Sequence, residues 1–449
     1  MHSHLQGHPA LIEAVKRLEN LNCDQFELYF VRKTATKIDC RDQKVDSLSR
    51  SEDLGLSIRM IQDQRMGFSF TTSLETDAIG RAVSSAAAVA ALMPQDPNHQ
   101  LFSFGSLAYP EVDSWDARGL AASTELKIAL AMELEAKAKS LDARIKTVRA
   151  ASLSEIASEV HMVDSNGEHI HHKATIYAAA LSCKAEQDGD SQMGWESMYS
   201  NYLDNIDTPQ VARLAVASAT ELLGAGAAPT MKCPAVIRND VMVDLLDFLS
   251  SSFSSEAMEK GQSMLAGRQG ERIASELVTL VDDGLMPGGI ATSPFDGEGI
   301  PSSKTTLIDG GFMVGAFYNS YYGRKLGKAP TGNSSRGIKS PPSISTTNLY
   351  MQPGKKAFDT LVGGITRGIL ITHLLGVHTA NAVTGDFSLG ASGILIENGK
   401  LTRPVKGFAV AGNVLELFRK ITDVGSDLRF FGSVGSPSVR IGELAVAGV

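Results

Sequence analysis

The uneven distribution of glycine is the feature of this sequence that most constrains its fold. Of the 42 glycines, 10 lie in residues 1–224 and 32 lie in residues 225–449. Glycine weakens long helices and concentrates at tight turns, so a glycine-rich segment favours short strands joined by turns. At 449 residues the chain also exceeds what one hydrophobic core usually organises. We therefore predict two domains of different architecture, residues 1–225 and residues 226–449.

The first half alternates helical and strand-like patterns. Helical patterns occur at residues 9–21, 76–93, 123–141 and 209–223, and strand-like patterns occur at residues 26–39, 54–61 and 66–72. Residues 146–165 and 169–185 are typical of a long β-hairpin, because Asn166 and Gly167 between them tolerate the positive φ angles of a tight turn. The first half is predicted to be an α+β domain with an antiparallel sheet and helices.

The second half consists mainly of short apolar runs broken by turn residues. Residues 305–317 and 392–405 each contain two such runs, separated by Asp-Gly or Asn-Gly. Two helices are expected, one at 413–424 and one through the stretch DLLDFLSSSFSSE, Asp244 to Glu256. In the latter, Val241, Leu245, Phe248, Leu249 and Phe253 follow the spacing of one helix face. We predict a glycine-rich, mainly antiparallel β domain, a barrel or a sandwich, with few helices.

Composition excludes several classes of protein. The net charge is −8 and no dense Lys/Arg cluster occurs, which argues against binding to the phosphate backbone of nucleic acids. The longest nearly apolar run, Ala82 to Met93, is too short to cross a membrane. The four cysteines are far apart in sequence, and no secretory signal precedes the first helix, so we expect a cytoplasmic protein.

Histidine offers weak candidates for metal binding. No histidine is followed by glutamate, so neither HExxH nor HExxxH occurs. His169 and His171 would share one face of a strand, where a pair can bind metal, but we interpret them as exposed hairpin residues. His373 and His378 are the only histidines of the second half, and we expect them in a loop or strand.

The remaining candidates are weaker still. His2, His4 and His8 occupy a terminal segment, where metal binding would be adventitious. Ser250 to Ser252 lie in no nucleophile motif such as GxSxG or SxxK, and small residues that allow close packing explain them more simply. We assign no metal ligand and no catalytic residue.

The densest group of polar side chains lies between Phe295 and Gly337. Loops that carry many hydrogen-bonding groups on a rigid scaffold are where binding sites concentrate, although a solvated surface loop is an equal alternative. The candidate substrate-binding residues are Asp296, Glu298, Lys304, Tyr318, Asn319, Arg324, Asn333 and Arg336.

Four motifs in this half carry a family resemblance. They are DGEGIPSSKTTLIDGG (Asp296 to Gly311), NSYYGRKLGKAPTGNSSR (Asn319 to Arg336), NLYMQPG (Asn348 to Gly354) and the run from Val383 to Asn413. In this order they resemble the TldD/PmbA family, known both as modulators of DNA gyrase and as peptidases. The first half resembles the family only in length and in the order of its elements.

The resemblance distinguishes two types of chain. TldD-type chains carry a helical HExxxH motif and a later cysteine that hold zinc, whereas TldE-type chains, also called PmbA, lack them. The HExxxH window corresponds to Asp247–Ser252, here DFLSSS, and the segment that would hold the cysteine, Phe430 to Glu443, has none. The chain therefore resembles the TldE type.

This resemblance implies a cytoplasmic subunit that pairs with a TldD-type chain in a heterodimeric metallopeptidase acting on extended or unfolded peptides. Zinc is expected in the partner and not in this chain, which would position the substrate. Three alternatives stay open: a homodimer that binds peptide or another ligand, a regulator that contacts DNA gyrase, and a hydrolase that uses Asp296 or Glu298 with a recruited metal.

Overall fold

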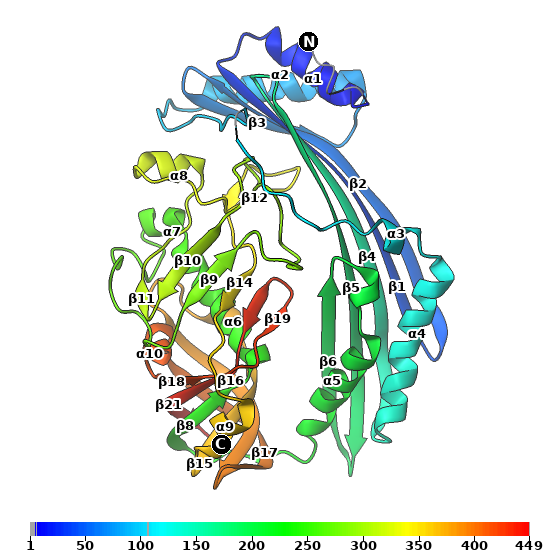
Figure 1. Cartoon of the computed structure of the whole chain (residues 1–449), viewed down its shortest axis with the longest axis vertical. Helices are drawn as coiled ribbons and strands as arrows, with labels where there is room; N and C mark the ends of the chain where they lie inside the picture. The colour runs from blue at the N-terminus through cyan, green and yellow to red at the C-terminus, as the bar shows by residue number, and fades with distance from the viewer. Residues whose placement is uncertain (1–4, 6, 106, 449) are drawn as a thin grey trace.

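The computed structural model describes residues 5, 7–105 and 107–448. A long, curved sheet built from the first part of the chain lies beside a second body built from the rest (Figure 1). Every strand from Gln25 to Ser200 belongs to the first sheet, and the strands from Gly226 onward form the other sheets. The α+β class predicted from the sequence is confirmed. No helix among the described residues is long and apolar enough to cross a membrane.

The first sheet has six strands in the order β3-β2-β1-β4-β5-β6, and every pairing is antiparallel. The strands are β1 (Gln25–Arg41), β2 (Lys44–Gln62), β3 (Arg65–Thr71), β4 (Ile145–Asp164), β5 (His169–Gln187) and β6 (Asp190–Ser200). The predicted hairpin is confirmed, with Gly167 at φ +81° in the turn between β4 and β5. β2 begins ten residues before its predicted start at Leu54, because its exposed polar part, Lys44–Asp53, pairs with β1 but lacks the apolar alternation of a half-buried strand.

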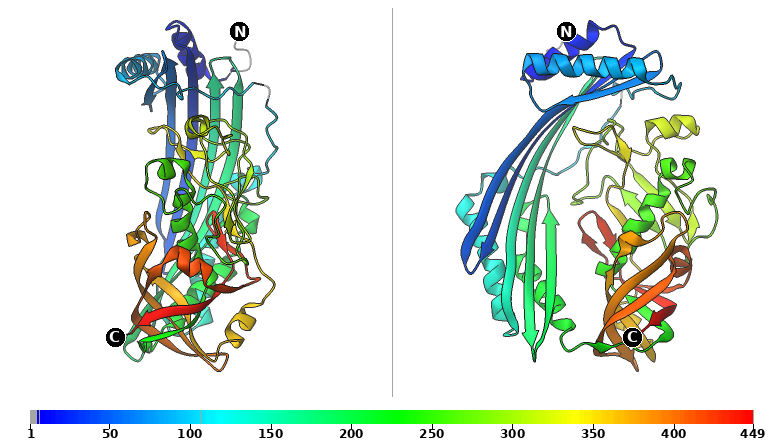
Figure 2. Two further views of the ribbon diagram at one scale, coloured as in Figure 1. Left: turned by 90° about the vertical axis from the view of Figure 1, so that its left-hand side faces the viewer. Right: turned by 180° about the vertical axis from the view of Figure 1, so that it is seen from behind.

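Helices cover the two ends of one face of this sheet (Figure 2). At one end, α1 (Pro9–Glu19) and α2 (Thr76–Leu92) bury Leu11, Leu18 and Ile79 against β1 and β2. At the other end, α4 (Thr124–Leu141) and α5 (Thr208–Glu221) pack on β4, β5 and β6. The short helices α3 (Ala117–Ala121) and η2 (Leu203–Asn205) complete this part of the chain.

The second body is built on a closed barrel. Its five strands are β8 (Met231–Ile237), β15 (Arg367–Leu375), β16 (Asp386–Glu397), β17 (Lys400–Asn413) and β21 (Val439–Ala447). Pairing of β17 with β21 closes the ring, and all pairings within it are antiparallel except that of β8 with β15. β7 (Gly226–Ala227) and β18 (Ile421–Val424) extend the same sheet.

A second sheet and short helices surround the barrel. The sheet contains β9 (Leu280–Asp283), β10 (Lys304–Asp309), β11 (Phe312–Met313), β14 (Leu349–Met351), β19 (Arg429–Phe431) and β20 (Val434–Ser436), and β12 (Ser334–Ser335) pairs with β13 (Ser343–Ile344). The helices are α6 (Asn239–Ser250), η3 (Ser251–Phe253), α7 (Ser255–Glu259), α8 (Ser320–Lys325), α9 (Phe358–Gly363), η4 (Val377–Thr379) and α10 (Val414–Arg419).

Two predicted helices differ from the structure. The helix predicted through Glu256 ends at Ser250, because Ser250 and Ser251 donate hydrogen bonds to backbone carbonyls three residues earlier, which competes with helical hydrogen bonding. Its apolar face is nevertheless buried, except for the half-buried Phe248. The helix predicted at 413–424 ends at Arg419, and Ile421–Val424 instead forms β18 beside β21.

Candidate functional site

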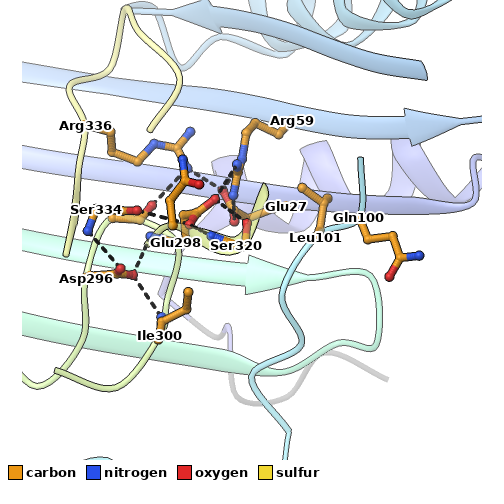
Figure 3. Close-up of polar contacts among 12 residues, drawn as sticks. Glu27, Arg59, Gln100, Leu101, Asp296, Glu298, Ile300, Ser320, Ser334 and Arg336 are labelled. Carbon is orange, nitrogen blue, oxygen red and sulfur yellow. Dashed lines mark hydrogen bonds and ion pairs between the residues drawn. The ribbon is translucent and has the colours of Figure 1, made fainter. Parts of the chain in front are cut away.

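The loop around Asp296 and Glu298 lies directly against strands β1 and β2 of the first sheet. Side chains from residues 27, 59, 298 and 336, far apart in sequence, meet in one buried network (Figure 3). Residues 295–301 and 334–336 bring the second body to this point, and β1 and β2 supply Glu27 and Arg59. The network therefore joins the two parts of the chain.

Glu298 is fully engaged by hydrogen bonds. Its carboxylate accepts from the backbone N–H and the hydroxyl of Ser320 at 2.8 and 2.6 Å, and from the Ser334 hydroxyl at 3.1 Å. Arg59 Nη1 lies 3.3 Å from Glu298 Oε1. With the carboxylate buried and surrounded by donors, Glu298 has the contacts of an anchor rather than of a general base open to a substrate.

Two arginines enclose Glu27. Arg59 binds the Glu27 carboxylate through Nε and Nη2 at 3.1 and 2.6 Å, and Arg336 donates to it from Nη1. Burial alone would raise the pKa of Glu27, but the two guanidinium groups outweigh it and hold that pKa below its ordinary value. Arg336 also stacks over the Tyr29 ring, 4.5 Å from its centroid. A paired charge of this kind is costly to leave without its partners.

Asp296 sits at the edge of the network and is held by backbone groups. Its carboxylate accepts N–H hydrogen bonds from Glu298, Ile300 and Ser334 at 2.8, 3.0 and 2.9 Å. Burial and the negative charge of Glu298 raise the pKa of Asp296 to about 7, against the opposite effect of the three N–H groups. Asp296 can therefore carry a proton near neutral pH.

A polar cavity of about 240 Å³ adjoins this carboxyl. Tyr29, Val160 and His172 of the first sheet form one wall, and Asp296 and Arg336 with several Ser and Thr side chains form the other. Burial and the nearby His171 lower the pKa of His172 to about 4, so this imidazole is neutral. The cavity offers hydroxyl and amide groups rather than an array of metal ligands.

Arg324 and Asn319 organise the neighbouring helix α8. Asn319 caps the helix by accepting the Tyr322 N–H at 2.8 Å. Arg324 donates to the carbonyl oxygens of Asn98 and Gln100 at 2.7 and 3.4 Å. Arg324 thus holds the connector that follows α2 against the second body.

Lys304, Tyr318 and Asn333 lie apart from the network. Lys304 and Tyr318 line an open cavity of about 650 Å³ between α7, β10 and β11, with Lys304 exposed. Asn333 is buried and donates to Asp282 Oδ2 at 2.7 Å, beside Thr347, which donates to the same carboxylate. The structure therefore divides the eight candidate residues among a buried network, a helix contact, an open cavity and the buried pair of Asn333 with Asp282.

Four residues of the network, Glu27, Arg59, Ser320 and Ser334, were not predicted from the sequence. Glu27 and Arg59 did carry a signal, since each is a charged residue inside an apolar strand, in FELYF and LSIRMI. Ser320 and Ser334 carry no comparable signal, because serine is common in glycine-rich loops.

The window that the family resemblance aligned with HExxxH, Asp247–Ser252, spans the end of α6 and the start of η3. The helix α6 packs beside β19, β20 and η4, so the segment that would carry the cysteine does lie next to it. Asp244, Asp247 and Ser251 are exposed on one face, whereas Ser252 is buried. Asp247 is thus accessible, whereas Ser252 at the other end of the window is not.

The histidines weighed as metal ligands lie in different parts of the structure. His171 is exposed, but His169 is half-buried and contacts His161, so the prediction of exposed hairpin residues is only half correct. His373 lies on β15 and His378 in η4, and His2 and His4 fall outside the described residues. Within the part of the chain that the structure describes, no three His, Cys, Asp or Glu side chains form a group that could hold a metal ion.

Models of a PmbA/TldA metallopeptidase match most of the chain. They match domain 1 at residues 26–90, the central domain at residues 118–223 and the C-terminal domain at residues 230–448. The metalloprotease PmbA of Escherichia coli is 25% identical over 431 residues, covering 95% of this chain and 92% of that protein. A metalloprotease TldD homolog of Haemophilus influenzae is 26% identical over 458 residues, covering 96% and 94%.

Solved structures share the fold. TldE from Thermococcus kodakarensis has a TM-score of 0.89 at 24% identity, covering 98% of this chain and 100% of that one. A putative modulator of a DNA gyrase from Thermotoga maritima also has a TM-score of 0.89 at 24% identity, covering 98% and 99%. Because the three family models together span most of its length, this chain belongs to the PmbA/TldD family of metallopeptidases.

Proposed function

We propose that this chain is a TldE/PmbA-type subunit of a cytoplasmic heterodimeric metallopeptidase. A TldD-type partner supplies the zinc, and this chain forms part of the chamber that receives an extended peptide. The chain itself carries no catalytic residue in this proposal. Its role is to position the substrate and to exclude water around the partner's reactive centre.

The observation that carries the proposal is the surface of α6. Its exposed residues are Asp244 and Asp247, followed by the exposed Ser251 at the start of η3, and no imidazole lies among them. A zinc hydrolase of the HExxxH type needs two histidine ligands and a glutamate that activates water. Phe248 cannot act as that base, and Ser252 faces the core.

The loop acids do not favour the alternative of a self-sufficient hydrolase. The Asp296 and Glu298 oxygens accept hydrogen bonds from three backbone N–H groups and from Ser320, Ser334 and Arg59, respectively. A recruited ion would have to displace these buried donors, leaving them unsatisfied. We therefore assign Asp296, Glu298 and Arg336 to the support of the chamber wall.

Substrate contact is assigned to the open cavity that contains Lys304 and Tyr318. It is lined by backbone and side-chain groups of Thr305, Thr306 and Thr331 as well as by Met258 and Leu265. Mixed polar and apolar lining suits an extended peptide, whose backbone and side chains present both kinds of surface.

The test compares three preparations on a casein-like unfolded substrate: this chain alone, this chain with a TldD-type partner, and the pair in which the HExxxH glutamate of the partner is replaced by glutamine. We expect hydrolysis only by the pair with the intact partner. Hydrolysis by the lone chain, or by the pair with the inactive partner, would show that this chain carries a catalytic centre of its own. A lone chain that neither cleaves nor assembles with the partner would instead support the homodimeric binding protein.

A further inference from the structure

Four imidazoles gather where helix α1 meets the first sheet. We call His8, His161, His169 and His171 the histidine cluster. The ring centroid of His161 lies 4.0 Å from that of His8, 5.2 Å from that of His169 and 5.5 Å from that of His171. Such a concentration of groups that titrate near neutral pH is unexpected on a structural sheet.

The fold brings these residues together through two simple rules. His161 on β4 is the register partner of His171 on β5, and His169 lies two residues from His171 and so on the same face. His8 is the residue immediately before α1, where that helix crosses the sheet. Three histidines therefore belong to the sheet, and the fourth belongs to the docked helix.

One hydrogen bond in the cluster depends on the protonation state. His161 Nδ1 lies 2.9 Å from His169 Nε2, and His161 Nε2 lies 3.0 Å from Glu159 Oε1. A bond between two imidazole nitrogens needs one N–H donor and one bare nitrogen, so it cannot form when both rings are protonated. Protonation of both rings must break it.

The surroundings favour the neutral cluster. Burial, with a contribution from the charges of His8 and His171, lowers the pKa of His161 in spite of Glu159. Among the described residues beside the cluster and its cavity, Glu13 of α1, Arg32 of β1 and Lys173 of β5 are also charged. Glu159 pairs with Lys173 at 3.1 Å, and Arg32 pairs with Glu52 at 3.3 Å. Glu159 can therefore balance one added proton but not several.

A cavity lies beside the cluster and depends on the position of α1. It has a volume of about 280 Å³ and is lined by His8, Pro9 and Leu11 of the helix segment and by Phe30, Leu74 and Ile79 of the elements beneath. Movement of the start of α1 would open this cavity and expose apolar side chains.

We propose that the histidine cluster is a proton-operated clasp, which holds the start of α1 on the first sheet at neutral pH and releases it on acidification. The rings of His161, His169 and His171 stack, and His8 lies tilted against His161. As the pH falls through about 6.5, an undocked histidine takes up a proton that docked His161 resists, so docking loses stability. Repulsion between imidazolium rings then separates His8 from His161.

The test measures amide hydrogen exchange in α1 between pH 7 and pH 5, corrected for intrinsic rates, with helix α4 as the internal reference. We expect protection in α1 to fall by about tenfold or more while protection in α4 stays constant. In each of the single variants His161→Asn and His169→Gln, whose new side chains can form hydrogen bonds but do not titrate, the loss of protection in α1 should be abolished. In His171→Gln, at an exposed position that tolerates substitution, the loss of protection should be reduced. This third variant keeps the test valid if His161→Asn fails to fold.

A control separates the clasp from other histidines. His378→Gln, in the second body, should retain the pH response of α1. The proposal is overturned if α1 and α4 lose protection in parallel, if the response persists in both His169→Gln and His171→Gln, or if His378→Gln removes it. None of these measurements uses peptide hydrolysis, so the result is independent of the proposed function.

Discussion

Arg59 shows how a single side chain can join two parts of a molecule. It is 5% exposed, binds Glu27 within the first sheet, and reaches Glu298 of the second body at 3.3 Å. Two carboxylates and two guanidinium groups, those of Arg59 and Arg336, balance one another in a region from which water is excluded. The balance is what allows the charges to be buried.

Arg59→Met should therefore destabilise the protein by about 3–5 kcal/mol, because it leaves two buried carboxylates with too little compensating charge. Chemical denaturation measures this loss. Arg32→Met is the matched control, since its ion pair with Glu52 has both side chains more than half exposed and is worth at most about 1 kcal/mol. Equal losses in the two variants would contradict the assignment of the network as a buried junction.

The contribution of Asp296 to the free energy of unfolding should depend on pH with a sign opposite to that of an ordinary carboxylate. Its pKa of about 7 in the folded protein exceeds the ordinary aspartate value of 3.8, so between about pH 4 and pH 7 the folded state holds a proton that the unfolded state has released. The contribution of Asp296 to stability is thus present at low pH and is lost as the pH rises through this window.

Asp296→Asn should remove this contribution. When the free energy of unfolding of the wild type minus that of the variant is plotted against pH, its slope between pH 4 and pH 7 should correspond to about one proton. The difference is the quantity to measure, because other carboxyls have shifts in the opposite direction, Glu27 among them. Parallel curves would mean that Asp296 is ionised in the folded protein throughout this range.

At the scale of elements, glycine sets how closely layers approach. Gly67 of β3 lies under α2, and a Cβ at this position would overlap the Ala86 carbonyl oxygen. Gly194 of β6 lies in the same way under Ala215 and Ala219 of α5. The few glycines of the first half thus include positions where a helix rests directly on a strand.

Gly67→Ala should destabilise the protein by about 1–3 kcal/mol, because the added methyl group must push α2 away from β3. Gly363→Ala is the control, since no atom lies within 4 Å of a Cβ built there, and it should change stability by less than about 0.5 kcal/mol. Thermal unfolding of the two variants gives the comparison. A tolerated Gly67→Ala would show that α2 shifts freely on the sheet.

At the scale of the whole molecule, residues 295–301, residues 334–336 and helix α8 of the second body contact the first sheet and its connector. Besides the buried network, Tyr109 donates to the Gly299 carbonyl at 2.8 Å, and Tyr321 donates to Asp96 at 2.7 Å. Arg324 adds the contacts to Asn98 and Gln100. These contacts gather near the end of the sheet that carries α1 and α2 (Figure 1).

Arg324→Ala should loosen the connector without unfolding the protein. The lost hydrogen bonds to a charged donor are worth about 1.5–3 kcal/mol locally, so proteolytic cleavage within residues 94–105 should become faster. Lys325→Ala is the control, because Lys325 lies on the same helix and makes a partly exposed ion pair with Glu259 and a contact with the Tyr322 ring, but, within the described residues, no hydrogen bond or ion pair with the connector. If the proposed complex forms, peptide processing should weaken in Arg324→Ala alone. Unchanged cleavage and processing would make Arg324 an ordinary surface residue.

Local pattern determined much of this protein by itself. The hairpin β4–β5, the helices α1, α2, α4 and α5, and the barrel-forming character of the glycine-rich half follow from periodicity and turn chemistry, which act over a few residues. Four ordered motifs were enough to identify the family. The absence of HExxxH is likewise a property of the sequence alone.

The tertiary structure decided which polar side chains lie together and which of them remain accessible to solvent. Asp296, Glu298 and Arg336 were indistinguishable from Lys304 and Tyr318 as loop residues, yet the first three are buried against β1 and β2 and the last two line an open cavity. The pairing of Arg59 with Glu298, 239 residues apart, and the meeting of His8 with His161 arise from the packing of distant elements. Sequence spacing determines local geometry, whereas burial and long-range pairing depend on the whole packed chain.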